Sequence, residues 1–258
     1  MDLDAIRGVG LAAAAKAGEI LRHYWGKTHC IDKKGAIDLV TEADLASEKA
    51  IIHLIRTAFP EHAVLAEESG LTSGTDSCQW IIDPLDGTTN YAHGLPAFTV
   101  SIAFAFEGEL IFGSVLNPVI EELFCGMRGR GASLNGRPIR VSTTQTLSDS
   151  LLVTGFPYDL QPVIHPMMKR FERCLMAAQG VRRLGSAALD LCYVACGRFE
   201  GFWEQNLAPW DTAAGVVIAE EAGASVSDFS NGPYAIEKKE ILATNGVIHE
   251  ELIPLLRL

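Results

Sequence analysis

The pattern of apolar residues changes near residues 142–149, where the chain reads Ser-Thr-Thr-Gln-Thr-Leu-Ser-Asp. Before this polar run, apolar side chains alternate with smaller ones from residue 100 to 106, and Glu107-Gly108 leads into a second apolar run at 110–116. A period of two is typical of a half-buried strand, and two such runs around a short turn form a hairpin. This part of the chain therefore predicts an antiparallel sheet.

After the polar run, short apolar stretches alternate with longer amphipathic ones. We therefore expect residues 1–144 to form an α+β part that contains the antiparallel sheet, and residues 145–258 to form an α/β part. The predicted helices are 5–25, 43–59, 164–179, 186–197 and 211–223, and the predicted strands are 63–66, 80–82, 130–134, 139–141, 151–155, 201–204, 224–228 and 241–244. Within the first part, Asn135-Gly136 is a signal for a type I′ turn.

Charge and length exclude several classes of protein. The 258 residues carry a formal net charge of -11, and 48% of them are apolar, as in an ordinary globular protein. An acidic chain has no basic excess with which to release counterions, so we expect no direct binding to nucleic acid. No apolar run reaches the roughly 18 residues that a membrane span needs, so we expect no membrane association. A phosphate-bearing ligand would need a local positive element, such as a metal ion or a helix N-terminus.

The N-terminus and the cysteines indicate a reducing compartment. Met1-Asp2-Leu3-Asp4 carries acids where a signal peptide carries Lys or Arg, which predicts a cytoplasmic protein. None of the six cysteines belongs to a CxxC pair, and most of them lie beside apolar residues. We therefore expect buried free thiols rather than a zinc site or a disulfide framework.

Carboxylates follow the ends of several apolar elements. Glu67 comes directly after the apolar run 63–66, Asp83 and Asp86 follow a second buried run, and Asp211 opens the helix predicted at its position. Acids at strand ends meet at one edge of a sheet, where they repel one another and take up protons unless a cation neutralises them. Hard oxygen ligands suit Mg²⁺ or Mn²⁺ better than zinc. The pattern therefore predicts a site for divalent metal ions.

The segment from Asp83 to Thr89 reads Asp-Pro-Leu-Asp-Gly-Thr-Thr. Pro84 fixes its own φ and restricts the preceding residue, so the two acids are held in a fixed relation. The Gly-Thr-Thr that follows exposes successive N–H groups at an expected helix N-terminus, which accepts phosphate through free amides and the helix dipole. An acid pair beside such a cradle is what a metal-bridged phosphate needs.

Each of these acids also has a purely structural explanation. Asp86 and Asp211 stand where Asp often caps a helix, and Asp44 follows Thr41 at the spacing of a capping box. Glu67 on its own would be a solvated strand end. All of them occur in one chain around the Asp-Pro-Leu-Asp-Gly-Thr-Thr segment, however, and the combination favours a catalytic site.

Five segments carry a resemblance to a known family. They are residues 38–44 (Asp-Leu-Val-Thr-Glu-Ala-Asp), 66–70 (Ala-Glu-Glu-Ser-Gly), 80–91, 185–191 (Gly-Ser-Ala-Ala-Leu-Asp-Leu) and 210–215 (Trp-Asp-Thr-Ala-Ala-Gly). The chain resembles the bacterial branch of the inositol monophosphatase family over essentially its full length. The resemblance implies a layered α-β-α-β-α sandwich of the inositol monophosphatase and fructose-1,6-bisphosphatase type. It also implies a homodimer and a metal-dependent, lithium-sensitive phosphatase.

The resemblance further implies two or three Mg²⁺ ions per site, with Mn²⁺ able to replace them. Glu67, Asp83 and the backbone carbonyl of Leu85 would hold the first ion. Asp83, Asp86 and Asp211 would hold the second, and Glu67 with water would help to hold a third.

Catalytic and lid residues are carried over in the same way. The resemblance implies that Thr88, paired with Asp44, orients and deprotonates the attacking water beside Glu67. Lys33 and Asp38 match positions on a lid that closes over the metals. No covalent intermediate is implied, so no cysteine or serine is expected to act as a nucleophile.

Substrate contacts come from both parts of the chain. The residues that match such positions are Asp86, Gly87, Thr88, Thr89, Gly185, Ser186, Ala187, Glu204 and Asp211. Glu204 matches the position that hydrogen-bonds polyol hydroxyls, which favours inositol 1-phosphate. Arg182 and Arg183 argue for a second phosphate, as in fructose 1,6-bisphosphate or a dual-specificity enzyme, but they could equally form a solvated or interface face.

Other activities stay open at this point. Members that resemble the chain act on NADP, 3′-phosphoadenosine phosphate or histidinol phosphate. A role of another class is regulatory binding to a protein partner such as the transcription machinery, since an acidic surface permits contact with a basic protein. The full set of acids favours catalysis, because a protein that only binds a partner has no physical need for every ligand.

Overall fold

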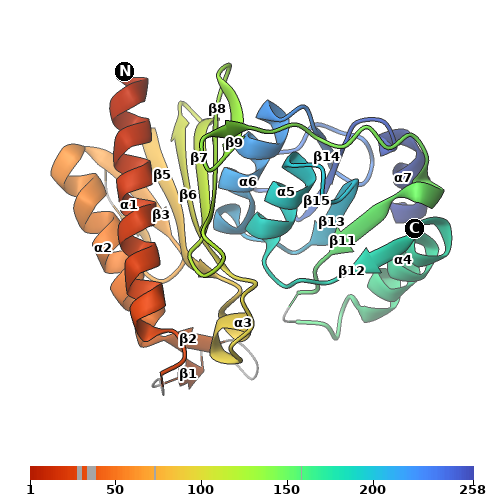
Figure 1. Ribbon diagram of the computed structural model, residues 1–258, viewed down its shortest axis with the longest axis horizontal. Helices are drawn as coiled ribbons and strands as arrows, with labels where there is room; N and C mark the ends of the chain where they lie inside the picture. Colours follow the sequence, from red (N-terminus) through yellow and green to blue (C-terminus); the bar gives the residue numbers. More distant parts are fainter. Residues whose placement is uncertain (28–30, 34–38, 73, 158) are drawn as a thin grey trace.

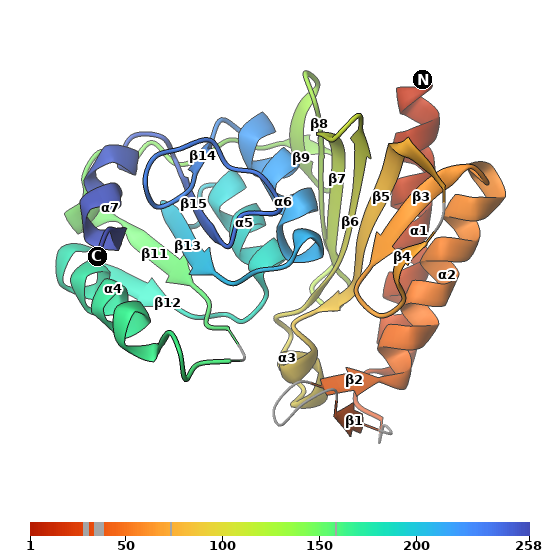
Figure 2. The ribbon, with the colours of Figure 1, turned by 180° about the vertical axis from the view of Figure 1, so that it is seen from behind.

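The structure is a computed structural model that describes residues 1–27, 31–33, 39–72, 74–157 and 159–258. Helices and sheets alternate in layers, in the order helix, sheet, helix, sheet, helix, across the long axis of Figure 1. Figure 2 shows the same layers from behind. The layered α-β-α-β-α architecture expected from the sequence is therefore confirmed.

An eight-stranded sheet forms the second layer, in the order β10-β9-β8-β7-β6-β5-β3-β4. Its strands are β3 (His62–Ala66), β4 (Gly70–Thr72), β5 (Thr75–Asp86), β6 (Thr99–Phe106), β7 (Glu109–Asn117), β8 (Glu122–Met127), β9 (Gly131–Leu134) and β10 (Arg137–Pro138). The sheet is antiparallel as expected, with one exception: β3 and β5 run parallel. That parallel pairing brings the carboxyl ends of two strands, and the acids that follow them, to the same edge.

Two long helices cover the outer face of this sheet. They are α1 (Leu3–Tyr24) and α2 (Glu42–Ala58), close to the predicted 5–25 and 43–59. Their apolar faces pack with Trp80, Phe104 and Phe112 of the sheet into one core. Asp2 begins α1 by accepting hydrogen bonds from the N–H groups of Asp4 and Ala5, as an N-cap does.

The inner face is covered by α5 (Ala187–Ala195) and α6 (Pro209–Glu221). Helix α6 lies against the sheet at two glycines, where a Cβ at Gly113 would stand 2.3 Å from the carbonyl oxygen of Ala214 and one at Gly126 would stand 2.8 Å from the Cα of Ile218. Any other residue at these positions would push the helix outward. This close packing fixes the start of α6 relative to the sheet edge.

The fourth layer is a five-stranded sheet in the order β12-β11-β13-β15-β14. Its strands are β11 (Leu151–Thr154), β12 (Gly180–Arg182), β13 (Gly201–Gln205), β14 (Ser225–Ser227) and β15 (Glu240–Thr244). Strand β11 runs parallel to both β12 and β13. Helices α4 (Ile164–Ala177) and α7 (His249–Leu256) form the last layer on its outer face.

Short elements complete the fold. A two-stranded sheet pairs β1 (Ile31–Lys33) with β2 (Leu39–Thr41), α3 (Thr88–Ala92) follows β5, and the single turn η1 (Leu147–Asp149) lies in the predicted polar run. Asn135 and Gly136 have φ of 49° and 75°, which confirms the predicted turn between β9 and β10. In the part of the chain that the structure describes, no helix is long and apolar enough to cross a membrane.

Candidate active site

A cavity of about 130 Å³ lies between the two parts of the chain, and acids from both parts line it. Its lining residues are Glu67, Asp83, Leu85, Asp86, Gly87, Thr88, Gly155, Phe156, Pro157, Arg183, Gly185, Ser186, Ala187, Glu204, Asn206, Leu207 and Asp211. Every carboxylate predicted as a metal ligand is in this set. Thr89 and Asp44 are not, although Asp44 contacts Thr88 from behind.

The end of β5 places two of the acids on this cavity. Asp83 pairs with Ser101 of β6 and Asp86 pairs with Thr99, so two residues of β5 lie opposite one of β6. Such a bulge suits Pro84, which has no N–H to give to the ladder. The Leu85 N–H donates to Asp83 Oδ1 at 2.9 Å and holds that side chain in place. The bulge turns the strand so that both acids point toward the cavity.

Asp86 is held by the start of α5. Its Oδ2 accepts hydrogen bonds from Ser186 Oγ at 2.6 Å and from the Ala188 N–H at 2.8 Å. Burial raises the pKa of Asp86 to about 6, and these hydrogen bonds oppose the rise because they favour the ionised form. Asp86 ends β5 and Gly87 is the N-cap residue of α3, so the alternative that Asp86 caps a helix is not what the structure contains.

Asp211 occupies the first turn of α6, where its Oδ2 accepts a hydrogen bond from the Ala208 N–H at 2.7 Å. The structural alternative is therefore correct in part, because Asp211 stabilises the helix start and also lines the cavity. Burial, followed by the charge of Asp86, raises the pKa of Asp211 to about 8. A carboxyl group with such a pKa is in an environment that favours a proton or a cation.

Asp83 and Glu67 are joined by a hydrogen bond. Burial, then the charges of Glu67, Asp86 and Asp211, raises the pKa of Asp83 well above its usual range. Among the described residues, no three Asp, Glu, His or Cys side chains stand in an arrangement that would hold a metal ion without movement. The donor set of four carboxylates and the Leu85 carbonyl is nevertheless the chemistry that Mg²⁺ requires. The residues fit a divalent cation, which would offset the burial and mutual repulsion that raise the pKa values of Asp83, Asp86 and Asp211.

The Gly-Thr-Thr turn begins α3 beside these acids. Gly87 has φ of 94°, and a Cβ there would lie 2.9 Å from the carbonyl oxygen of Ala97, so only glycine fits. The Thr88 hydroxyl lies 3.3 Å from Asp44 Oδ1 and 3.0 Å from the carbonyl oxygen of Leu85. Thr88 and Asp44 are both buried; Thr88 lines the cavity and Asp44 lies behind it.

The far wall belongs to the second part of the chain. Glu204 on β13 is buried, and a Cβ at Gly155 would lie 2.0 Å from its Oε2. Arg183 lies with its guanidinium carbon 5.8 Å from the centre of the Phe156 ring, at the cavity wall. Arg182 does not line the cavity; it is exposed and hydrogen-bonds to the carbonyl oxygen of Val181. The structure therefore separates the two arginines that the sequence grouped.

Sequence reasoning missed one side of the cavity, formed by Gly155, Phe156 and Pro157 with Asn206 and Leu207. A signal was present, because each group follows a strand of the second sheet, and ligands of α/β sheets bind beyond the carboxyl ends of parallel strands. The lid prediction stays untested: Asp38 lies outside the described residues, and of Lys33 only its backbone position in β1 is described.

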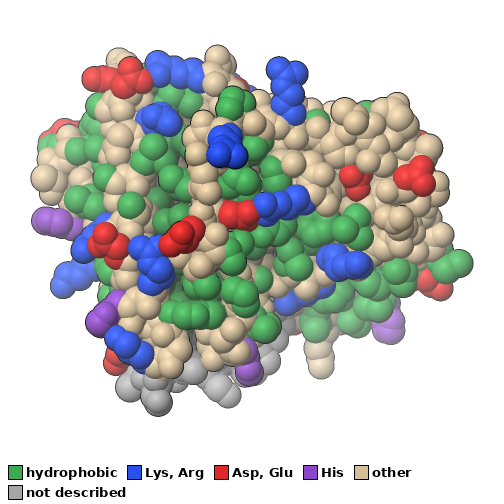
Figure 3. Space-filling view, in the orientation of Figure 1, with side chains coloured by type: hydrophobic (Ala, Val, Ile, Leu, Met, Phe, Trp, Pro, Cys, Tyr) green, Lys and Arg blue, Asp and Glu red, His purple; other side chains and the backbone are tan. Residues whose placement is uncertain are grey.

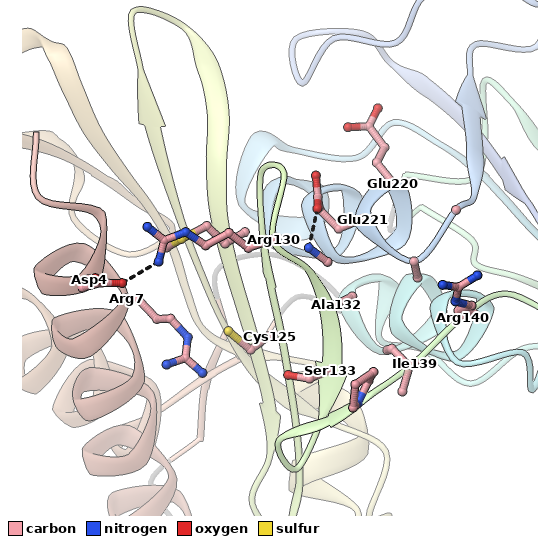
Figure 4. A pocket seen from close by; sticks show the side chains of 15 residues that line it. Asp4, Arg7, Cys125, Arg130, Ala132, Ser133, Ile139, Arg140, Glu220 and Glu221 are labelled. Carbon is pink, nitrogen blue, oxygen red and sulfur yellow. Dashed lines mark hydrogen bonds and ion pairs between the residues drawn. The ribbon is translucent and has the colours of Figure 1, made fainter.

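A larger cavity, of about 660 Å³, lies elsewhere, beside the hairpin of β8 and β9. Acids of this cavity pair with other groups of the chain. In Figure 4, Arg130 donates to Asp4 on α1, and Glu221 accepts a hydrogen bond from the Gly131 N–H at 2.7 Å. On the face seen in Figure 3, Lys and Arg side chains are scattered among acidic and apolar ones. The carboxylate-lined cavity is therefore the best candidate for chemistry.

Comparison with known proteins gives a consistent result. The family model described as the inositol monophosphatase family matches residues 2–258. The chain is 48% identical to the inositol-1-monophosphatase of Synechocystis sp. over 97% of its length and 88% of that protein. It is 43% identical to the Nus factor SuhB of Pseudomonas aeruginosa over 92% of its length and 90% of that protein.

A solved structure agrees with the sequence comparisons. The inositol monophosphatase from Anabaena (Nostoc) sp. superposes with a TM-score of 0.91 at 46% identity, covering 99% of this chain and 96% of that one. The resemblance read from the sequence motifs is thereby confirmed. The chain belongs to the inositol monophosphatase family, whose members are metal-dependent phosphatases.

Proposed function

We propose that the protein hydrolyses a small phosphate monoester with the help of Mg²⁺, most specifically inositol 1-phosphate to inositol and phosphate. The observation that carries this proposal is the convergence of Glu67, Asp83, Asp86 and Asp211 on one cavity beside the amide end of α3. Buried acids that repel one another favour a divalent cation. A cation among them supplies the positive element that an acidic protein needs to bind phosphate.

The metal-holding role falls to the four carboxylates and the Leu85 carbonyl, for two or three ions. When bound, Mg²⁺ neutralises charge on the phosphate and lowers the pKa of a coordinated water. The hydrogen bonds on Asp86 Oδ2 and Asp211 Oδ2 fix the planes of those two carboxylates. The chain thus fixes the orientation of two ligands before any ion arrives.

Thr88 and Asp44 are proposed to handle the proton of the attacking water. The Thr88 hydroxyl can accept a hydrogen bond from water at the cavity while its own proton points to Asp44 Oδ1. Asp44 is fully buried in the first turn of α2, so it holds this orientation without competition from solvent. Glu67 on the opposite side orients the same water, and Gly87, Thr88 and Thr89 offer N–H groups to the phosphate.

Substrate choice is proposed to depend on Glu204 and the start of α5. A buried carboxylate accepts hydrogen bonds from polyol hydroxyls and repels a second phosphate. Gly185, Ser186 and Ala187 line the cavity next to it and face the same substrate. The name of the Synechocystis relative, inositol-1-monophosphatase, supports this assignment.

Two further functions have specific support. Arg183 lines the cavity, which favours a second phosphate and hence fructose 1,6-bisphosphatase activity or dual specificity. The Pseudomonas relative is named a Nus factor, which supports a regulatory role with a transcription partner in addition to catalysis. We also propose that the protein acts as a homodimer.

Phosphate release from a substrate panel tests the proposal. The panel is inositol 1-phosphate, fructose 1,6-bisphosphate, NADP, 3′-phosphoadenosine 5′-phosphate and histidinol phosphate, each with Mg²⁺ and with EDTA. We expect EDTA-sensitive turnover that is highest on inositol 1-phosphate and lost in Asp83→Asn. Preference for fructose 1,6-bisphosphate would favour the second candidate, and a complete lack of turnover would remove the phosphatase assignment for these esters.

A further inference from the structure

Asp190 is a buried acid that the proposed reaction does not use. Its side chain is 0% exposed, and among the described residues neither of its carboxylate oxygens has a hydrogen-bond partner. The only other buried side-chain atom in this condition, within the same described part, is the Ser114 hydroxyl of β7. Native proteins satisfy most buried polar groups, so an unpartnered carboxyl group needs an explanation.

The position of Asp190 ties it to the active-site cavity. It lies in α5, one helical turn after Ala187, which lines the cavity, and on the same side of the helix. The start of this helix is the element that holds Asp86, through Ser186 and Ala188. Asp190 is therefore carried on the same short helix as the contacts that position a metal ligand.

The charges around Asp190 come from two strands and from the loop that follows β12. Glu204 of β13 and Asp86 of β5 are the negative groups that act on it, and Arg183 is the positive one. Burial, then the charges of Glu204 and Asp86, raises the pKa of Asp190 well above its usual range, while Arg183 opposes the rise. Asp190 therefore interacts electrostatically with acids that surround the proposed cation site.

Stability does not account for this residue. A buried carboxyl group without hydrogen bonds costs free energy relative to an apolar side chain of similar size, and the neighbouring Leu189 and Leu191 are fully apolar. Proteins tend to break such packing rules at functional sites. The requirement must come from the cavity, because every charged group that acts on Asp190 lines it.

We propose that Asp190 is a positioning residue for the metal centre, a carboxylate that contacts no metal ion but whose negative charge helps to retain divalent cations at Asp86 and its neighbours. This inference rests on the proposed function. Coupling between the charge of Asp190 and bound cations is reciprocal: cations near Asp86 favour the ionised form of Asp190, and that form attracts the cations. Without cations the same group is a destabilising buried acid.

The test compares the wild type with Asp190→Asn, which keeps the shape and removes the charge. Mg²⁺ binding is measured by isothermal titration calorimetry, and thermal unfolding is measured in EDTA and in saturating Mg²⁺. We expect the Mg²⁺ dissociation constant of the variant to rise by about tenfold, the lower end for residues that act through a ligand. In EDTA the variant should unfold at the same temperature as the wild type or higher, and Mg²⁺ should raise that temperature by less.

Ser114→Ala is the matched control, because it removes the other unpartnered buried group at a position outside the cavity lining. It should leave Mg²⁺ affinity unchanged. Wild-type Mg²⁺ affinity in Asp190→Asn, or a lower unfolding temperature in EDTA, overturns the inference. A second variant, Asp190→Ala, is included in case Asp190→Asn does not fold. If neither variant folds, Asp190 is needed for folding and the inference is wrong. If the wild type itself binds no Mg²⁺, the proposed function fails first.

Discussion

The metal-free protein should become less stable as the pH rises through about 8, and Asp211→Asn should remove much of that dependence. The pKa of Asp211 is raised from 3.8 to about 8, chiefly by burial and then by Asp86. Between these two values the folded protein holds a proton that the unfolded chain has released. The stability that this proton contributes is fully present below pH 3.8, the unfolded pKa, and is lost as the pH rises through the folded pKa of about 8.

The size of the effect follows from the shift. Between about pH 7 and about pH 8.5 the folded carboxyl group loses most of its proton while the unfolded one is already ionised, so the free energy of unfolding falls by about 1.2 kcal/mol at 1.36 kcal/mol per pKa unit. Asp211 is partly exposed through the cavity, and solvent screening makes this an upper value. For a chain of this size it corresponds to about 3 °C in unfolding temperature. The lowered pKa values of His62 and His249 keep both residues neutral in this window.

Urea unfolding in EDTA at both pH values, for the wild type and Asp211→Asn, measures the difference directly. The amide of the variant keeps an oxygen that can accept the Ala208 N–H but cannot titrate. Raised cysteine pKa values contribute equally to both proteins and cancel in the comparison. The Asp211 charge also helps to raise the pKa values of Asp83 and Glu204, so these fall in the variant and add to the difference between the two proteins. Parallel pH profiles for the two proteins, or a wild type that gains stability toward pH 8.5, would refute the reasoning.

Three other changes test the site. Asp44→Asn should lower kcat by about 100-fold or more because it removes the proton acceptor behind Thr88, while calorimetry should show unchanged Mg²⁺ affinity; equal loss of both would assign Asp44 to metal binding instead. Gly155→Ala should raise KM for inositol 1-phosphate severalfold, since its Cβ would displace Glu204, whereas Gly8→Ala meets nothing within 4 Å and should leave KM unchanged; similar KM values in both variants would speak against the Glu204 contact. Millimolar LiCl at limiting Mg²⁺ should inhibit phosphate release, and full activity there would count against the lithium-sensitive assignment.

Local patterns were sufficient for much of the fold. The helical periodicity of 5–25 and 43–59 placed α1 and α2 to within two residues, and alternation around Glu107-Gly108 identified the β6–β7 hairpin. The spacing within Asp83 to Thr89 also brought the acids and the amide end of α3 together correctly, because Pro84 and Gly87 act on their immediate neighbours. These features depend on residues that are close in sequence.

Features that depend on long-range packing were not predictable. The parallel pairing of β3 with β5 and the short strand β12 are decided by neighbours far away in sequence. The Gly155 wall of the cavity follows a predicted strand, but it faces the acids only because β11 pairs with β13. In the sequence, Asp190 is an ordinary polar residue within an apolar helix. Its burial without hydrogen-bond partners follows from the packing of α5 between two sheets.

Anomalous X-ray diffraction from crystals soaked in Mn²⁺ and inositol 1-phosphate would test most directly whether the acid-lined cavity is a divalent-metal phosphatase site. We expect anomalous peaks between Glu67, Asp83, Asp86 and Asp211, with phosphate density at the N–H groups that begin α3. Peaks that avoid this cavity while Mn²⁺ supports turnover in solution would contradict the assignment of these carboxylates as the metal ligands.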